Sequence, residues 1–287
     1  MTKDKIEAIA SKAPDRRRFL QSVGLASAAL AGASSLARAQ SSTTTPSFTD
    51  TDILNFALNL EYLEAEFYTV AVTGLTLEQS GFDVGGTAAG PTTGGQQVNF
   101  ANQDLLTGYV ATAIMNDEQE HVTFLRTALG SAAIPKPAIN LNALGIGFND
   151  EVDFLAVSRA LEDTGVTAYA GAAPLLTNPT YVGAAARILA TEAEHSGNIR
   201  LQVALLRNSI AGFLAPLDPK DILPPTAGNF TAFFPVNSMG LVETRTVPEV
   251  LYIVYGMKSG VTSGGFFPKG INGYFSTTPS QEATALD

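Results

Sequence analysis

Apolar residues recur every three or four positions in four long segments of this 287-residue chain. This spacing places them on one face of an α-helix, so each segment is predicted to form an amphipathic helix. Stretches rich in glycine and proline separate the segments and exclude regular helix between them. The predicted helices span about 53–72, 103–129, 149–173 and 180–209. The pattern indicates an all-α four-helix bundle over residues 51–210.

The segments outside the helical pattern differ in length and composition. Residues 74–100 are rich in Gly and Thr and are predicted to form a loop-like insertion. Residues 132–147 form a long crossover between the second and third helices. Residues 211–287 begin as a proline-rich linker and continue into an aromatic, loop-rich tail, with one short helix predicted over 246–255. We expect this C-terminal extension to pack on the bundle or on a neighbouring subunit.

Two predicted helices carry the same polar motif within their apolar stripes. Glu118 with His121, and Glu192 with His195, form two Glu-x-x-His pairs 74 positions apart, and the chain has no other histidine. Residues three apart lie on one helix face, so each pair can reach one ion. A single pair of this kind is most often a solvated helix surface. Two pairs on stripes that face the core favour a metal site, because buried charged groups are costly without a partner.

The first and third helices also match each other. Glu61 is followed seven residues later by Tyr68, and Glu162 is followed seven residues later by Tyr169. Seven residues make about two helical turns, so each tyrosine shares a face with its glutamate. Three roles are open for the tyrosines: hydrogen bonds to ligand carboxylates, electron donation during a redox reaction, or simple packing in the core.

Two further glutamates of the first helix are not assigned to the metal. Glu64 lies one turn after Glu61, where it could serve as an alternative carboxylate at the metal site, but we expect it to be solvated or to support the ligands. Glu66 points away from the stripe and is expected to be solvated.

The composition narrows the chemistry. The chain has no cysteine, which excludes disulfides, thiolate nucleophiles, zinc fingers and iron–sulfur clusters. Carboxylates with one imidazole for each metal suit iron or manganese, whereas zinc sites prefer fewer ligands and more nitrogen or sulfur.

The N-terminus has the order of regions found in a signal peptide. Residues 16–20, Arg-Arg-Arg-Phe-Leu, resemble a twin-arginine export signal, and an apolar run and an Ala-x-Ala cleavage motif at 37–39 follow. Asp15 stands where such signals usually have Ser or Thr, so general secretion stays open. We expect residues 1–39 to be removed, 40–50 to be a flexible leader, and the product to be periplasmic or extracellular without stable membrane insertion.

The charge of the chain also limits its partners. The net charge is −10, and without residues 1–39 the chain holds 10 Lys and Arg against 24 Asp and Glu. Nucleic acid and anionic lipid are therefore not expected partners, whereas metal cations would be attracted.

The order of motifs resembles the ferritin-like carboxylate proteins, in which two helices each supply a Glu and two others each supply a Glu-x-x-His. Residues 60–68 and the Gly-Gly-Phe-Phe-Pro sequence at 264–268 are further similar to an exported ferritin-like family that includes plant desiccation-related proteins. This resemblance implies two Fe ions per chain, or alternatively two Mn ions. The implied ligands are Glu61, Glu118, His121, Glu162, Glu192 and His195.

The resemblance also implies how the ligands divide. Glu118 and Glu192 would bridge the two ions. Glu61 with His121 would complete one ion's ligands, and Glu162 with His195 those of the other.

The activity implied is that of a di-iron oxidoreductase or ferroxidase that acts on Fe2+, O2 or peroxide during envelope stress. Two alternatives stay open. One is a manganese catalase, although its fourth helix typically supplies His without the matching Glu. The other is a non-enzymatic metal-binding or structural protein that protects against drying. The sequence leaves the oligomeric state open, a homo-oligomer included, but the insertion and the C-terminal extension disfavour a ferritin-type storage cage.

Overall fold

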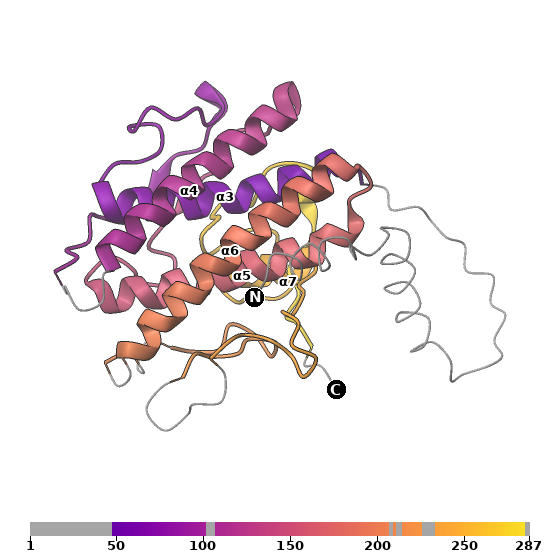
Figure 1. Cartoon of the computed structure of the whole chain (residues 1–287). Helices are drawn as coiled ribbons and strands as arrows, with labels where there is room; N and C mark the ends of the chain where they lie inside the picture. The colour runs from indigo at the N-terminus through magenta and orange to yellow at the C-terminus, as the bar shows by residue number, and fades with distance from the viewer. Residues whose placement is uncertain (1–47, 102–106, 207–208, 211–213, 226–232, 285–287) are drawn as a thin grey trace, which may run out of the picture. The chain divides into compact units, whose positions relative to one another are not determined.

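A computed structural model of the chain describes residues 48–101, 107–206, 209–210, 214–225 and 233–284. Within these residues the predicted all-α fold is confirmed (Figure 1). The helices are α3 (Asp50–Thr73), α4 (Thr107–Leu129), α5 (Glu151–Ala172), α6 (Pro179–Leu206) and the short α7 (Val247–Val254). None of the described helices has both the length and the apolar character needed to span a membrane. The predicted signal peptide and nearly all of the predicted leader lie outside the described residues.

Short elements connect these helices. The 3-10 turns are η1 (Gly86–Ala88), η2 (Gly130–Ala132), η3 (Ala173–Leu175) and η5 (Tyr274–Thr277), and the strands are β1 (Thr92–Thr93) and β2 (Ile139–Asn140). The strands pair in parallel and join the insertion to the crossover between α4 and α5.

The long helices pack as two pairs. Helix α3 lies along α4 and α5 lies along α6, and the pairs meet through α3 with α5 and α4 with α6. Side chains of α3 and α5 are buried almost along their whole length, whereas α4 and α6 each keep an exposed face. A single apolar stripe predicts a helix that is buried on one face. The two central helices, α3 and α5, are instead buried on nearly all faces.

Capping boxes begin both central helices. Thr49 caps α3 and exchanges hydrogen bonds with Asp52, and Asp150 does the same with Asp153 at the start of α5. Each cap satisfies backbone N–H groups that the helix itself leaves unpaired. Asp50, the first residue of α3, accepts a hydrogen bond from the backbone of Asn178, just before α6 begins.

A buried ion pair joins α3 to the crossover. The Lys136 ammonium lies 2.6 Å from a Glu66 carboxylate oxygen, and both side chains are fully buried. Lys136 also lies 2.9 Å from the more exposed carboxylate of Glu78 in the insertion. The prediction that Glu66 is solvated is therefore wrong. Its partner stands 70 positions away in the chain, where no helical pattern indicates a contact.

The C-terminal extension covers the side of the bundle that α3 and α5 form. Helix α7 packs on α5, and η5 packs on α3. The side chain of Asn59 on α3 donates to the carbonyl of Asn272 and accepts from its backbone N–H, at 3.0 and 2.9 Å. Phe266 and Phe267 are buried in the same layer. Solvent therefore approaches the bundle interior from the side of α4 and α6.

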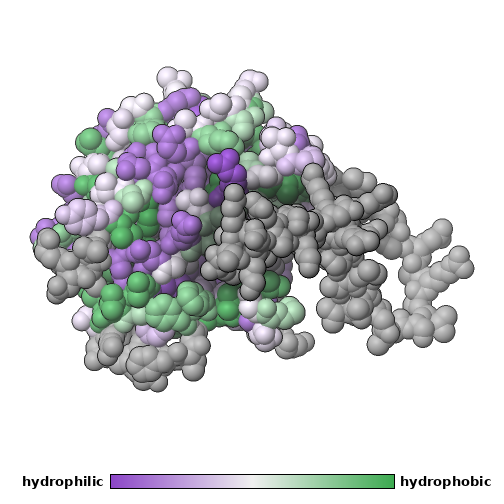
Figure 2. Space-filling view, in the orientation of Figure 1, coloured by the Kyte–Doolittle hydropathy of each residue, from purple (hydrophilic) through white to green (hydrophobic). Residues whose placement is uncertain are grey.

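Large apolar side chains stay exposed on α6 and in the extension. Figure 2 shows hydrophobic patches among hydrophilic surface on the visible face. The exposed set includes Leu201, Leu205, Phe234, Met239 and Leu241. Such surface is typical of contacts between proteins. A homo-oligomer stays a prediction.

Removing the buried cation tests the ion pair. Lys136→Met leaves Glu66 charged and buried, so we expect the free energy of unfolding to fall by about 3–5 kcal/mol in urea titrations. The control is Asp83→Asn, which breaks an ion pair with Arg126. It is a suitable control because the Asp83 side chain is 73% exposed. That change should cost less than about 1 kcal/mol. Equal losses in the two variants would show that Lys136 has no special role.

Candidate metal centre

The six side chains predicted as metal ligands come together inside the bundle. Helices α3 and α5 each supply one Glu, and α4 and α6 each supply a Glu-x-x-His. All four carboxylates are fully buried, and the two imidazole side chains are 12% and 7% exposed. The residues are Glu61, Glu118, His121, Glu162, Glu192 and His195.

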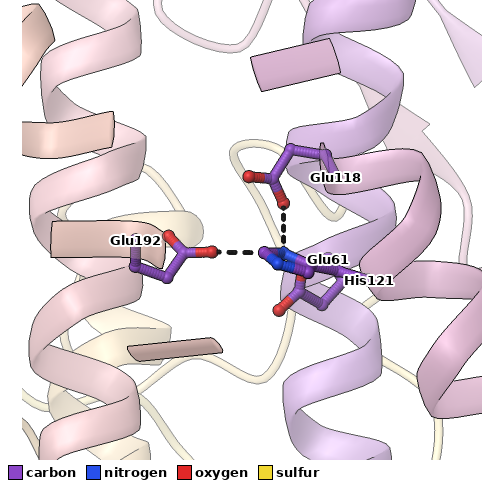
Figure 3. Close-up of side chains that lie close together, drawn as sticks. All are labelled: Glu61, Glu118, His121 and Glu192. Atoms are coloured by element: carbon purple, nitrogen blue, oxygen red, sulfur yellow. Dashed lines mark hydrogen bonds and ion pairs between the residues drawn. The ribbon is translucent and has the colours of Figure 1, made fainter. Parts of the chain in front are cut away.

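One group of ligand atoms gathers around His121. Its Nδ1 atom lies 3.2 Å from a carboxylate oxygen of Glu61 and 3.2 Å from one of Glu118. Glu192 reaches across from the other helix pair, with its Oε1 atom 3.5 Å from the same nitrogen (Figure 3). Ligand atoms of these four residues all lie within 4.8 Å of one another.

The second group gathers around His195. Its Nδ1 atom lies 3.0 Å from Oε1 of Glu118 and 3.4 Å from Oε2 of Glu162. With Glu192 these residues again place ligand atoms within 4.8 Å of one another. Glu118 and Glu192 belong to both groups, so the chain forms two adjacent four-residue groups that share two carboxylates.

Several atoms of these groups lack a hydrogen bond. Among the described residues, the buried atoms without a hydrogen-bond partner include Glu118 Oε1, Glu162 Oε2, both Glu192 carboxylate oxygens and His195 Nδ1. Glu118 Oε1 and His195 Nδ1 lie only 3.0 Å apart, yet they do not have hydrogen-bond geometry. Buried polar atoms without partners are costly. Cations shared among these oxygens and nitrogens would satisfy them, so the donor set fits two metal ions.

Two tyrosines brace the helix pairs across the site. The Tyr68 hydroxyl on α3 donates to Glu162 on α5 at 2.5 Å. The Tyr169 hydroxyl on α5 donates to Glu61 on α3. Burial, and then the neighbouring carboxylate, raise the pKa of each phenol well above its usual value. Both phenols therefore stay protonated and act as hydrogen-bond donors to ligand carboxylates. The redox role suggested for them stays a prediction.

The site holds protons when no metal is bound. Burial and the Glu61 carboxylate raise the pKa of Glu118 to about 7. Burial alone would lower the pKa of His121, but the carboxylates of Glu61 and Glu118 outweigh it and raise this pKa to about 12. The pKa of His195 rises to about 12 for the same kind of reason, through Glu118 and Glu162. Metal binding must displace these protons.

A fifth carboxylate lies beside the ligands. Glu64 is 4% exposed, so the alternative that it is solvated is wrong. Its position depends on a glycine of α5. A Cβ atom at Gly165 would stand 2.5 Å from Oε2 of Glu192 and 3.2 Å from Oε1 of Glu64. The sequence signal that could have identified it is a glycine inside a predicted helix, where glycine is less stable than alanine.

Asp117 is a second residue that the motif comparison missed. Its carboxylate lies 3.0 Å from Nε2 of His195, on the side away from the ligands. Such a contact orients an imidazole so that its other nitrogen faces the metal. The matching position 74 residues later is Thr191, whose hydroxyl donates to the backbone of Arg187. Comparing the two motif copies therefore gives no sign of Asp117. The surroundings of the two histidines are also not equivalent.

Filling the space at position 165 tests whether the glycine positions the carboxylates. Gly165→Ala should displace Glu192 and weaken metal binding by about 10- to 100-fold, the range seen when residues that support ligands are changed. Gly197→Ala on α6 is the matched control, because a Cβ atom there meets nothing within 4 Å. Metal titration of both variants provides the measurement. Unchanged affinity in Gly165→Ala would contradict the assigned role.

Comparison with known proteins agrees with this fold. The family model described as a ferritin-like domain matches residues 49–205. A relative named ferritin-like catalase Nec2, from Nesocodon mauritianus, is 26% identical over 266 aligned residues, which cover 78% of this chain and 84% of the relative. Because the family model covers more than half of the chain and includes both Glu-x-x-His motifs, this protein belongs to the ferritin-like domain family.

Proposed function

We propose that this protein binds two redox-active metal ions and uses them to break down peroxide. One observation carries the proposal: two buried groups of metal-ligating atoms share Glu118 and Glu192. The relative named as a ferritin-like catalase supports peroxide as the substrate. Iron is the metal we propose first, and manganese is the alternative, since hard carboxylates with one imidazole for each ion suit both.

Each ligand has a role in this proposal. Glu118 and Glu192 would hold both ions. Glu61 and His121 would hold one ion, and Glu162 and His195 the other. When bound, the metal pair would pass electrons between peroxide molecules by changing between divalent and trivalent states, giving two electrons to the peroxide that is reduced to water and taking two from the peroxide that is oxidised to O2.

The protein itself contributes orientation and exclusion of water. Tyr68 and Tyr169 hold the two outer carboxylates by donating hydrogen bonds to them. Asp117 turns His195 toward the ligands. The four ligand carboxylates are fully buried. A site enclosed in this way favours small reactants such as peroxide or O2 over bulky organic substrates.

Ferroxidase activity is the second candidate. The Asp117 carboxylate is 52% exposed and contacts His195, so it joins the surface to the ligand groups. Glu120 and Glu194, at matching positions of α4 and α6, are exposed carboxylates. Together they would attract Fe2+ from solvent as a substrate.

The proposed location of this activity is the cell envelope or the exterior. The support is the signal-like order of residues 16–39. Export by the twin-arginine route would carry a folded protein with its metals already bound.

Metal content and turnover test the function together. We expect about two Fe or Mn ions per chain, consistent with two ligand groups, and O2 release when peroxide is added. Glu118→Ala/His121→Ala should lose both the metal and the activity. Asn116→Ala, an exposed change on the same helix, should keep both. A folded protein that binds no metal would contradict the proposal. Bound metal that consumes neither peroxide nor O2 would instead support the non-enzymatic alternative.

Metal binding should depend on pH, because the metal-free site holds protons. Glu118, with its pKa raised from 4.5 to about 7, and His121, raised from 6.5 to about 12, bind protons more tightly in the folded protein. The stability that they contribute to the metal-free protein is therefore lost as the pH rises through these values. Metal competes with the same protons, so its affinity should rise with pH.

Calorimetry measures this linkage. Metal titrations near pH 7, in buffers with different ionisation enthalpies, should show release of at least one proton from each histidine. Thermal unfolding of the metal-free protein should shift to lower temperature between about pH 5 and about pH 9. Metal binding without proton release would contradict the proposed ligands.

A further inference from the structure

A cavity lies at the end of the bundle where α3 begins and α5 ends. Its volume is about 430 Å³, and none of the six proposed metal ligands lines it. We propose that this cavity is a binding site for an uncharged small organic molecule with an aromatic or aliphatic body. Ligand-binding cavities in proteins commonly have volumes of roughly 300–1,000 Å³ and mainly apolar walls.

Aromatic side chains form one wall of the cavity. The ring of Phe275 packs against those of Phe48 and Phe56, with centroids 5.5 and 5.7 Å apart. All three rings line the cavity. Phe48 lies just before α3, Phe56 lies on α3 and Phe275 lies on η5, so the C-terminal extension completes a wall that the α3 segment alone leaves open. A ring or an alkyl chain would gain contact with these faces.

Small residues of α5 keep the opposite wall open. Ala168, Gly171 and Ala172 line it. A Cβ atom at Gly171 would stand 2.2 Å from the carbonyl oxygen of Arg245, so α5 and the segment before α7 are in direct contact there. Larger side chains on this wall would fill the space that a ligand needs.

The electrostatics of the lining disfavour a charged ligand. Arg245 is the one charged residue among the described lining residues. Two of its nitrogens lie 2.7 Å from the carboxylate oxygens of Asp218, and the third donates to the hydroxyl of Thr167 at 2.7 Å. The guanidinium is thus already neutralised and bonded. A carboxylate or phosphate entering the cavity would lose its water without gaining a counter-charge.

The chain that precedes the cavity is a competing occupant. Residues 40–47, immediately before Phe48, are Gln, Ser, Thr and Pro, and none has a large apolar side chain. Burying their amides and hydroxyls in an apolar cavity would be costly. The chemistry of the walls therefore favours a separate organic molecule.

Fluorescence titration of the purified full chain tests the site. The probe is N-phenyl-1-naphthylamine, an uncharged molecule that emits more strongly in apolar surroundings. We expect saturable binding of one probe per chain. Ala172→Phe should weaken that binding at least tenfold, while thermal unfolding and metal content stay unchanged. The matched control, Ala186→Phe at an exposed position of α6, should bind like the unaltered protein.

Further arms of the experiment separate the alternatives. Thr278 of the C-terminal extension also lines the cavity, so Thr278→Phe should fill it from that side. This variant is used if Ala172→Phe fails to fold. The sulfonated analogue 1-anilinonaphthalene-8-sulfonate should bind at least tenfold more weakly, and equal binding would overturn the assignment to uncharged ligands. The absence of saturable binding, or equal binding by the obstructed variants, would overturn the site. If the affinity for the probe falls as the protein concentration rises, a second copy of the chain occupies the cavity, and the assignment to a small organic molecule is overturned.

Discussion

Four carboxylates and two imidazoles meet in the buried interior of this bundle, and the rest of the structure depends on how their charge is balanced. Buried like charges destabilise one another, and each loses its hydration on folding. Protons balance part of this charge, as the raised pKa values of Glu118 and both histidines show. Buried atoms that still lack hydrogen bonds indicate that protons alone are insufficient. Two shared cations would balance the charge and satisfy these atoms together.

The fold holds this charge cluster in place from several sides. Helices α3 and α5 form the centre, and each sends a tyrosine to the carboxylate of the other. The C-terminal extension covers their outer side through the Asn59 and Asn272 contact. The Lys136 and Glu66 pair ties the crossover to α3. Access to the site is left on the side of α4 and α6, where Asp117 joins His195 to solvent. The packing of the helices and the extension therefore both encloses the metal centre and leaves it one side of access.

Much of this arrangement was predictable because it is periodic. The stripe of apolar residues indicated the helices, and the repeated Glu-x-x-His motif identified both residue pairs on α4 and α6. The structure brings these pairs together with Glu61 and Glu162. Glu66 shows the limit of such reasoning, because its burial depends on a lysine from the crossover. Asp117 was missed because the repeat has Thr191 in its place, whereas Gly165 carried a local signal that was available.

We propose that Glu118 and Glu192 hold two cations at once. Crystals of the iron- or manganese-loaded protein, measured on both sides of the metal's absorption edge, test it directly. We expect two anomalous peaks about 4 Å apart, a typical spacing for two-metal sites. Both peaks should contact these two glutamates, with His121 beside one and His195 beside the other. A single peak, or peaks bound only by exposed carboxylates such as Asp117, would contradict the account.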